Sequence, residues 1–223
     1  MKSIAIDGPA GAGKSTLARR LAGRLGYLYV DTGAIYRTVA LCAIEAGADP
    51  ADPAQVIPLL EGLDLQMSYG SDGVQHMYLS GRDVSEDIRV HAVSQCASLA
   101  AAIPEVRAFL LEYQRRLAEE QNVVMDGRDI GTVVLPKADV KIFLTASARE
   151  RARRRLRELE QRGQTADFET VLRDIEQRDH LDRTRAAAPL RQAEDAVLLD
   201  TSELDLEGSL NALLEIVKGK VSS

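Results

Sequence analysis

Cysteine is scarce in this chain: Cys42 and Cys96 are the two examples among 223 residues. They lie far apart, and neither belongs to a C-x-x-C pair, the spacing typical of zinc sites and redox motifs. Two isolated thiols also cannot build the disulfide framework of a small secreted domain. We therefore expect reduced, buried thiols in a cytoplasmic protein.

Long hydrophobic runs are missing as well. No apolar stretch approaches the ~18 residues that a membrane-spanning helix needs. Residues 1–2 lead directly into a predicted strand that contains Asp7, unlike the apolar core of a signal peptide. We therefore expect a soluble chain with no targeting segment and no membrane partner.

Positive charge is in deficit, because 28 lysines and arginines face 34 acidic residues and the formal net charge is -6. General affinity for nucleic acid needs a basic face that displaces counterions. We expect no nucleic-acid partner, and any polyanion must be met by a local group of cations. The three histidines show no metal-ligand spacing, and no assembly motif is evident, so a monomer is the default expectation.

A glycine-rich loop with a lysine stands close to the start of the chain. It fits the pattern G-x-x-x-x-G-K-[ST] and reads Gly8-Pro9-Ala10-Gly11-Ala12-Gly13-Lys14-Ser15. Residues 3–6 before it are apolar, as in a buried strand, and residues 17–25 after it carry leucines on one helical face. Backbone N–H groups and the helix dipole favour a phosphate there. We expect a bound nucleoside triphosphate, with Lys14 on the exposed loop reaching its β- and γ-phosphates and the Ser15 hydroxyl ligating Mg²⁺.

Hydrophobic periodicity predicts an α/β fold around this loop. The apolar segments typical of buried strands are residues 3–6, 27–30, 123–125, 140–144 and 196–200. Helical patterns alternate with them, which predicts a P-loop NTPase fold: a five-stranded parallel sheet with helices on both faces. Residues 48–53 begin a loop-rich connection. Alternating residues from 63 to 79, with a turn at 70–73, then predict an antiparallel β insert that closes near Gly81.

Polar clusters follow three of the predicted strands, at Asp7-Gly8, at Asp31-Thr32 and at residues 126–129. Ligands of parallel α/β sheets bind beyond the carboxyl ends of the strands, so these clusters should converge on one cleft. Asp126 ends an apolar strand and could hold Mg²⁺ through a water molecule. The second acidic residue expected of a motor ATPase is missing, and so is the guanine-reading N-K-x-D motif of a switch GTPase.

Arginines are concentrated in residues 149–162, which follow a predicted helix start at Ser147. Arg151 and Arg155 lie four residues apart on one helical face, and Arg154 is adjacent to that face. Phosphoryl transfer needs positioned cations around the moving group, so the segment predicts an arginine-rich lid. The alternative is a solvated surface helix whose glutamates offset part of the charge.

Four segments together resemble bacterial cytidylate kinases, and the resemblance runs from about residue 3 to the last strand. These segments are residues 6–15, 31–37, 126–132 and 178–185. The resemblance implies phosphorylation of CMP and dCMP with ATP and Mg²⁺. No serine or cysteine has a base partner identifiable from the sequence, so we expect direct in-line transfer without a covalent intermediate. The resemblance also implies one kinase domain over residues 1–223, with a core (1–62, 92–146 and 186–223), an insert that binds the nucleoside monophosphate (63–91) and a lid (147–185).

The resemblance further assigns residues to roles. ATP phosphates would lie on the loop from Gly8 to Thr16, with the lid residue Arg154 beside them. Catalytic cations would be Lys14, Arg128, Arg151 and Arg155, and Mg²⁺ would be near Ser15 and Asp126. Substrate-binding positions would be Thr32, Tyr36, Arg37, Ser98, Arg107, Arg128, Asp129, Arg178, Asp182 and Arg185. Thr32 replaces a serine of some relatives, and Leu181 replaces a charged residue of some others.

The chemistry of cytosine agrees with two of these positions. Its N4 amine is a donor beside the acceptors N3 and O2, so a carboxylate such as Asp129 with an arginine such as Arg107 is its complement. The alternative is that Asp129 only caps the turn that follows it. Two other functions stay open at this point: a small P-loop kinase for UMP, AMP or a metabolite, and a non-catalytic ATP-binding sensor.

Overall fold

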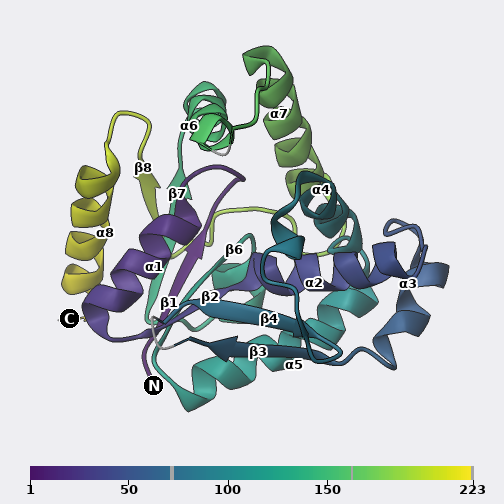
Figure 1. The fold of residues 1–223 in the computed structure, drawn as a ribbon. Coiled ribbons are helices and arrows are strands. Elements are labelled where there is room, and N and C mark those ends of the chain that lie inside the picture. The colour runs from purple at the N-terminus through teal and green to yellow at the C-terminus, as the bar shows by residue number, and fades with distance from the viewer. Residues whose placement is uncertain (71–72, 162, 222–223) are drawn as a thin grey trace.

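The computed structural model describes residues 1–70, 73–161 and 163–221. Its centre is a five-stranded parallel sheet in the order β2-β6-β1-β7-β8 (Figure 1). The strands are β1 (Ser3–Asp7), β2 (Leu28–Asp31), β6 (Val123–Gly127), β7 (Val140–Thr145) and β8 (Val197–Asp200). The five predicted strands and their parallel arrangement are confirmed.

Both faces of this sheet are buried, which explains the continuous apolar runs of its strands. In β1, Ile4 and Ile6 belong to one hydrophobic cluster and Ala5 belongs to the other. The first cluster also contains apolar residues of α1 (Lys14–Leu25) and α8 (Leu206–Val221). The second contains those of α2 (Thr32–Glu45) and α5 (Pro104–Glu120). Alternation along each strand therefore fixes two helical layers on the sheet.

The predicted antiparallel insert is confirmed and has one more strand than expected. It consists of β3 (Leu65–Tyr69), β4 (Gln75–Leu79) and the short β5 (Arg82–Asp83), in that order. Met67 pairs with Met77 in the register of β3 and β4. Of the turn predicted at 70–73, residues 71 and 72 lie outside the described part of the chain.

Two polar side chains of the insert bond to the backbone of β2, the last strand of the sheet on that side. The Tyr69 hydroxyl donates to the Tyr29 carbonyl over 2.8 Å. The Gln75 amide accepts from the Asp31 N–H over 2.8 Å and donates to the Asp31 carbonyl over 3.2 Å. The insert is thereby fixed beside the end of β2, where the polar residues Asp31 and Thr32 lie.

The connection expected to be loop-rich contains a helix, α3 (Pro53–Leu60). Asp52 caps it by accepting from the Ala54 N–H, and Pro53 occupies the first turn, where its missing N–H is harmless. The Ala-Asp-Pro pattern was interpreted as a break, although it is also a helix start. A single 3-10 turn, η1 (Asp87–Arg89), then leads into α4 (His91–Ala100).

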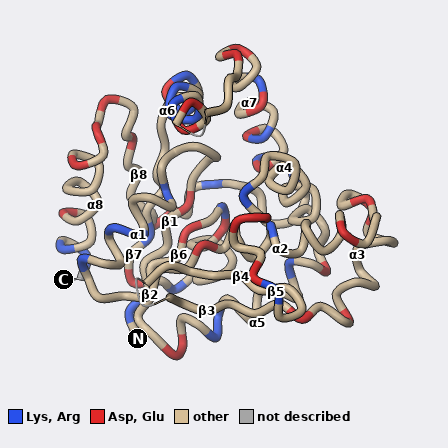
Figure 2. The backbone as a smooth tube through the Cα atoms, in the orientation of Figure 1, with Lys and Arg blue, Asp and Glu red and all other residues tan. Residues whose placement is uncertain are grey.

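The arginine-rich helix α6 (Ala148–Gln161) and α7 (Phe168–Thr184) stand above the carboxyl ends of the strands (Figure 1). They enclose a small apolar cluster of their own around Ala152 and Leu172. The predicted helix start at Ser147 is confirmed, because its hydroxyl accepts from the Glu150 N–H. Asp167 caps α7 in the same way, since its carboxylate accepts from the Thr170 N–H. Basic and acidic residues both crowd α6 (Figure 2).

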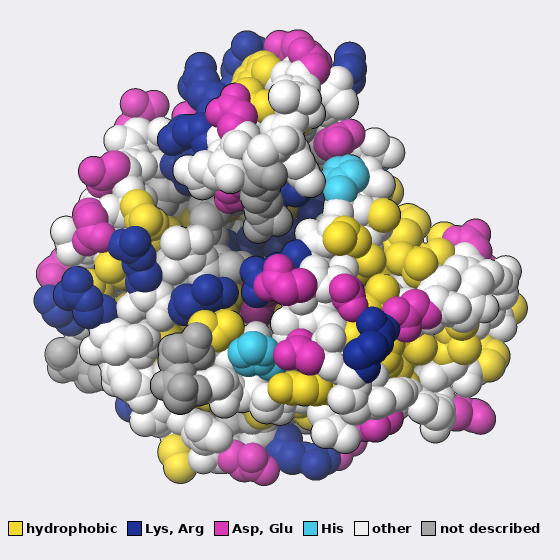
Figure 3. Space-filling view, viewed as in Figure 1, with side chains coloured by type: hydrophobic (Ala, Val, Ile, Leu, Met, Phe, Trp, Pro, Cys, Tyr) yellow, Lys and Arg dark blue, Asp and Glu magenta, His cyan; other side chains and the backbone are white. Residues whose placement is uncertain are grey.

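Cys42 and Cys96 are free, as expected, but both are half-buried instead of fully buried. Across the described ranges, no helix is both long enough and apolar enough to cross a membrane. Figure 3 shows the molecule hollowed between the α6–α7 unit and the body below it, with basic side chains inside the hollow. That hollow lies above the strand ends where the polar clusters were predicted to meet.

Candidate active site

The glycine-rich loop connects β1 to α1 and can only be built with glycine at its first position. A Cβ on Gly8 would lie 1.9 Å from the Leu144 carbonyl oxygen of β7. Gly13 has φ of +86° and precedes α1, whose first turn carries neither a side-chain cap nor an acidic residue. The free N–H groups of that turn therefore face the loop interior and favour an anion.

Lys14 is the first residue of α1 and is buried, at 5% exposure, which corrects the expectation of an exposed loop lysine. Its Nζ donates to the Pro9 carbonyl over 2.8 Å, so the side chain folds back over its own loop. Burial, together with the positive charges of Arg128 and Arg178, lowers the pKa of Lys14 to about 7. Lys14 therefore lies within electrostatic reach of two arginines from the other side of the hollow.

Ser15 and Asp126 are neighbours, as a shared metal site would require. The Ser15 hydroxyl donates to Asp126 Oδ2 and the Tyr29 hydroxyl donates to Oδ1, both over 2.9 Å. Burial, together with the nearby charge of Asp31, raises the pKa of Asp126 to about 6. Within residues 1–70, 73–161 and 163–221, no three His, Cys, Asp or Glu residues group as a metal cage. Two oxygen donors suit Mg²⁺, which usually keeps water and phosphate ligands.

Arginines from three elements form a second group of cations, opposite the loop. Arg37 is held by Asp31 over 2.9 Å, and Arg128 is held by Asp182 over 2.6 Å. Burial lowers the pKa of Arg178 to about 10, with smaller contributions from the positive charges of Arg128 and Arg37. The Nε atoms of Arg37 and Arg178 are buried and have no hydrogen-bond partner among the residues that the structure describes. Crowded guanidinium groups with unused donors are the signature of an anion site.

Asp129 lies in the middle of a further group. Its carboxylate is paired with Arg107 on one oxygen and with Arg185 on the other, the latter over 3.4 Å. The Arg107 guanidinium lies 5.5 Å from the centre of the Tyr36 ring. A mostly apolar cavity of about 320 Å³ adjoins Tyr36 and Arg107. The flat ring of Tyr36 at the cavity and the ion pairs of Asp129 suit a planar, polar ligand.

Two more predicted substrate positions are found nearby. Thr32 is buried, and its hydroxyl donates to the Asp126 carbonyl over 2.7 Å. Ser98 is half-buried on α4, a helix that packs against α2 and α7. The hydrogen bond from Thr32 joins the ends of β2 and β6, so the predicted convergence of the strand-end clusters is confirmed.

The three lid arginines have different surroundings. Arg151 is 3% exposed and donates to the Ala10 carbonyl of the loop over 2.9 Å and twice to Asp179, over 2.6 and 3.0 Å. Arg154 donates to the Thr201 carbonyl over 2.7 Å. Arg155 is half-buried, pairs with Glu158 over 3.1 Å, and its charge reaches Arg178. Arg151 thus ties α6 to the loop, while Arg155 borders the second group of cations.

The sequence did not predict two residues, Asp7 and Tyr29, that position the site through hydrogen bonds. Asp7 was recognised only as part of a strand-end cluster, yet its two carboxylate oxygens accept from the Ile130 and Gly131 N–H groups, both over 2.7 Å. Burial raises the pKa of Asp7 to about 6. Tyr29 was assigned to a strand without its bond to Asp126. The partners lie about a hundred residues away, so no local pattern signals them.

Comparisons with known proteins agree with the resemblance stated above. The family model described as cytidylate kinase matches residues 4–219. A cytidylate kinase of Carboxydothermus hydrogenoformans is 52% identical over 217 residues, covering 97% of each chain. One of Caldicellulosiruptor bescii is 49% identical, covering 96% of this chain and 94% of its own.

Among solved structures, an uncharacterized protein from Eubacterium ventriosum has the same fold. It has a TM-score of 0.54 and 13% identity, and the match covers 98% of this chain and 99% of that one. This likeness shows the fold alone. With the family model matched over almost its full length and relatives near half identical, the chain belongs to the cytidylate kinase family.

Proposed function

We propose that this protein transfers the γ-phosphoryl group of ATP to CMP or dCMP, giving ADP and CDP or dCDP. The observation that carries the proposal is that two groups of cations, Lys14 of the phosphate loop and the arginines around Arg178, lie at the same hollow. Lys14 of the phosphate loop lies within electrostatic reach of Arg128 and Arg178, and the second group has unused buried donors on Arg37 and Arg178. Two phosphate sites that face each other fit transfer from one nucleotide to another.

On this proposal the loop from Gly8 to Thr16 holds the phosphates of ATP, with Arg154 beside it. Lys14 gives up its bond to the Pro9 carbonyl and neutralises the β- and γ-phosphates. Ser15 and Asp126 would hold Mg²⁺, which supplies charge neutralisation between the β- and γ-phosphates. Arg128, Arg151 and Arg155 stabilise the negative charge on the equatorial oxygens of the moving group.

The acceptor is the α-phosphate of CMP, bound by Tyr36, Arg37 and Arg128. No covalent intermediate is needed, because this phosphate oxygen attacks in line once the two nucleotides are aligned. Asp182, Arg178 and Arg185 would hold the ribose and phosphates. Closure of the lid, residues 147–185, over the insert and core would exclude water during transfer.

Base selection falls to the group around Asp129. Its carboxylate accepts from the cytosine N4 amine, and Arg107 addresses the acceptor edge, with Thr32 and Ser98 completing the pocket. The ion pairs of Asp129 with Arg107 and Arg185 hold the carboxylate in place before the base arrives. We further propose that the protein acts in the cytoplasm as a monomer.

A coupled assay of ADP release tests the proposal with CMP, dCMP, UMP and AMP as acceptors, each with ATP and Mg²⁺. We expect turnover with CMP and dCMP and much less with UMP and AMP. The Lys14→Met variant is the control, which should fold and lose nearly all turnover, because it keeps the length of the side chain without its charge. Equal turnover with every acceptor, or none with CMP, would refute the assignment.

A further inference from the structure

The turn that follows Asp129 is a single π-helical turn, η2 (Ile130–Val134). The Asp129 carbonyl accepts from the Val133 N–H over 2.9 Å and from the Val134 N–H over 3.2 Å, so Asp129 is the N-cap residue of the turn. Its side chain meanwhile faces Arg107 and Arg185. The position of the Asp129 carboxylate therefore depends on how firmly this turn is held.

The amino end of η2 is held by Asp7, and its carboxyl end is held by Arg115. Arg115 Nε donates to the Val134 carbonyl over 3.0 Å, and Nη2 donates to the Val133 carbonyl over 2.9 Å. Carbonyls at the end of a helical turn have no partner within it, and bonds from a guanidinium are stronger than neutral ones. Arg115 thus fixes the end of the turn that Asp7 does not reach.

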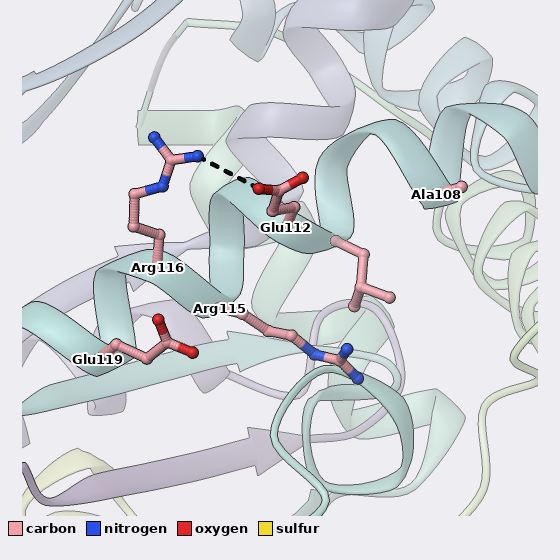
Figure 4. Close-up of a pocket in the computed structure, with 6 residues that line it drawn as sticks. Ala108, Glu112, Arg115, Arg116 and Glu119 are labelled. Carbon is pink, nitrogen blue, oxygen red and sulfur yellow. Dashed lines mark hydrogen bonds and ion pairs between the residues drawn. The ribbon is translucent and has the colours of Figure 1, made fainter.

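Arg115 and Arg107 both project from α5, eight residues or about 12 Å apart along its axis. The helix α5 therefore contacts the Asp129 side chain through Arg107 and the carboxyl end of η2 through Arg115. Figure 4 shows the Arg115 side chain extending away from α5 toward a neighbouring coil, while Arg116 leaves the helix in another direction. Arg116 pairs with Glu112 over 3.4 Å and is exposed. The two adjacent arginines thus differ in their contact with η2.

We propose that Arg115 is a positioning residue for base recognition: it fixes η2 against α5 and thereby aligns the Asp129 carboxylate with Arg107. The proposal rests on the proposed function, because it concerns how that site distinguishes cytosine from uracil. A carboxylate that drifts loses the cytosine N4 amine first, since uracil has no donor at that position. Loss of Arg115 should therefore penalise CMP more than UMP.

The test compares Arg115→Met with the matched control Arg116→Met. We expect Arg115→Met to lower the ratio of kcat/KM for CMP to kcat/KM for UMP by roughly tenfold, below the hundredfold that a 1 Å misplacement can cost. The KM for ATP should stay unchanged, and Arg116→Met should leave the ratio intact. Arg115→Lys keeps one donor and should give an intermediate ratio. Adding Asp129→Ala to Arg115→Met should lower the ratio no further than Asp129→Ala alone.

A second measurement does not depend on activity. Amide hydrogen exchange at residues 133–135 should speed up in Arg115→Met and not in Arg116→Met, because only the first releases the end of η2. An unchanged base ratio in Arg115→Met would overturn the inference, and so would an equal loss with CMP and UMP, which indicates a general structural role. If the wild-type protein itself fails to phosphorylate CMP, the proposed function fails instead, and the two failures are thus distinguished.

Discussion

At the scale of single residues, the surroundings of Lys14 disfavour its charged ammonium form in the free protein. Burial and the neighbouring arginines lower its pKa to about 7, so above pH 7 the amine is mostly neutral in the free protein. A bound triphosphate favours the ammonium form. We therefore expect ATP binding to take up a proton above pH 7 and the dissociation constant to rise with pH between about 7 and 9, by at most about tenfold per pH unit.

Titration calorimetry at pH 8 in two buffers of different ionisation enthalpy measures this proton uptake. Lys14→Met is the control. It should bind ATP more weakly, and its binding should lack the proton uptake that Lys14 contributes. Identical uptake in both proteins would mean that Lys14 is already charged when ATP binds.

Asp129 gives a prediction about base choice. We expect Asp129→Ala to lower kcat/KM for CMP by about 1.5–3 kcal/mol, the range for a hydrogen bond to a charged group. UMP should lose less, because its carbonyl cannot donate to the carboxylate. Steady-state kinetics with both substrates measures the difference, and thermal unfolding shows whether Arg107 and Arg185, left without their partner, weaken the fold. An equal loss on both substrates would assign Asp129 to structure or to the phosphates.

The sequence is informative about residues whose role is encoded locally. The glycine-rich loop could be predicted because spacing along the chain determines its geometry, and the cluster at residues 126–129 because it ends a strand. Burial of Lys14 could not be predicted, since the side chain folds back onto the Pro9 carbonyl of its own loop, a contact that the spacing does not encode. The backing roles of Asp7 and Arg115 also escaped prediction, because both bind backbone groups of η2, which any sequence presents.

At the scale of elements, one face of α6 carries an arginine that stabilises the fold and another that we expect to act in catalysis. Arg151 is enclosed by Asp179 and the loop carbonyl of Ala10, whereas Arg155 borders the arginine group around Arg178. We expect Arg151→Met to destabilise the fold by about 3–5 kcal/mol, because it leaves Asp179 buried and unpaired. Arg155→Met should change stability by less than about 0.5 kcal/mol and lower kcat roughly 10- to 100-fold.

Chemical denaturation and steady-state kinetics on the two variants separate these effects. Arg153→Met serves as the control, since Arg153 is exposed and pairs only weakly with Glu150 over 3.4 Å. If Arg155→Met unfolds as readily as Arg151→Met, α6 is a structural helix along its whole length and the lid proposal loses its support.

Elements were predictable where one periodicity persisted over several residues. The strands of the sheet, the antiparallel insert and the capped starts of α6 and α7 follow from such patterns. The helix α3 was missed because the prolines at 50 and 53 suggested a break, although Pro53 starts the helix and Pro58 is accommodated inside it. β5 is two residues long and η2 is a single turn, so neither has a period to detect.

At the scale of the whole molecule, the insert has a consequence for solubility. β2 is a terminal strand of the sheet, and a bare terminal strand recruits strands of other chains. The Tyr69 hydroxyl and the Gln75 amide occupy the outward-facing backbone groups of Tyr29 and Asp31. We therefore expect the insert to protect β2 from pairing with strands of other chains. We expect Tyr69→Phe combined with Gln75→Ala to raise light scattering on mild heating, while Gln66→Ala, an exposed change on the same hairpin, leaves it unaltered. Equal scattering from both would show that bulk alone shields β2.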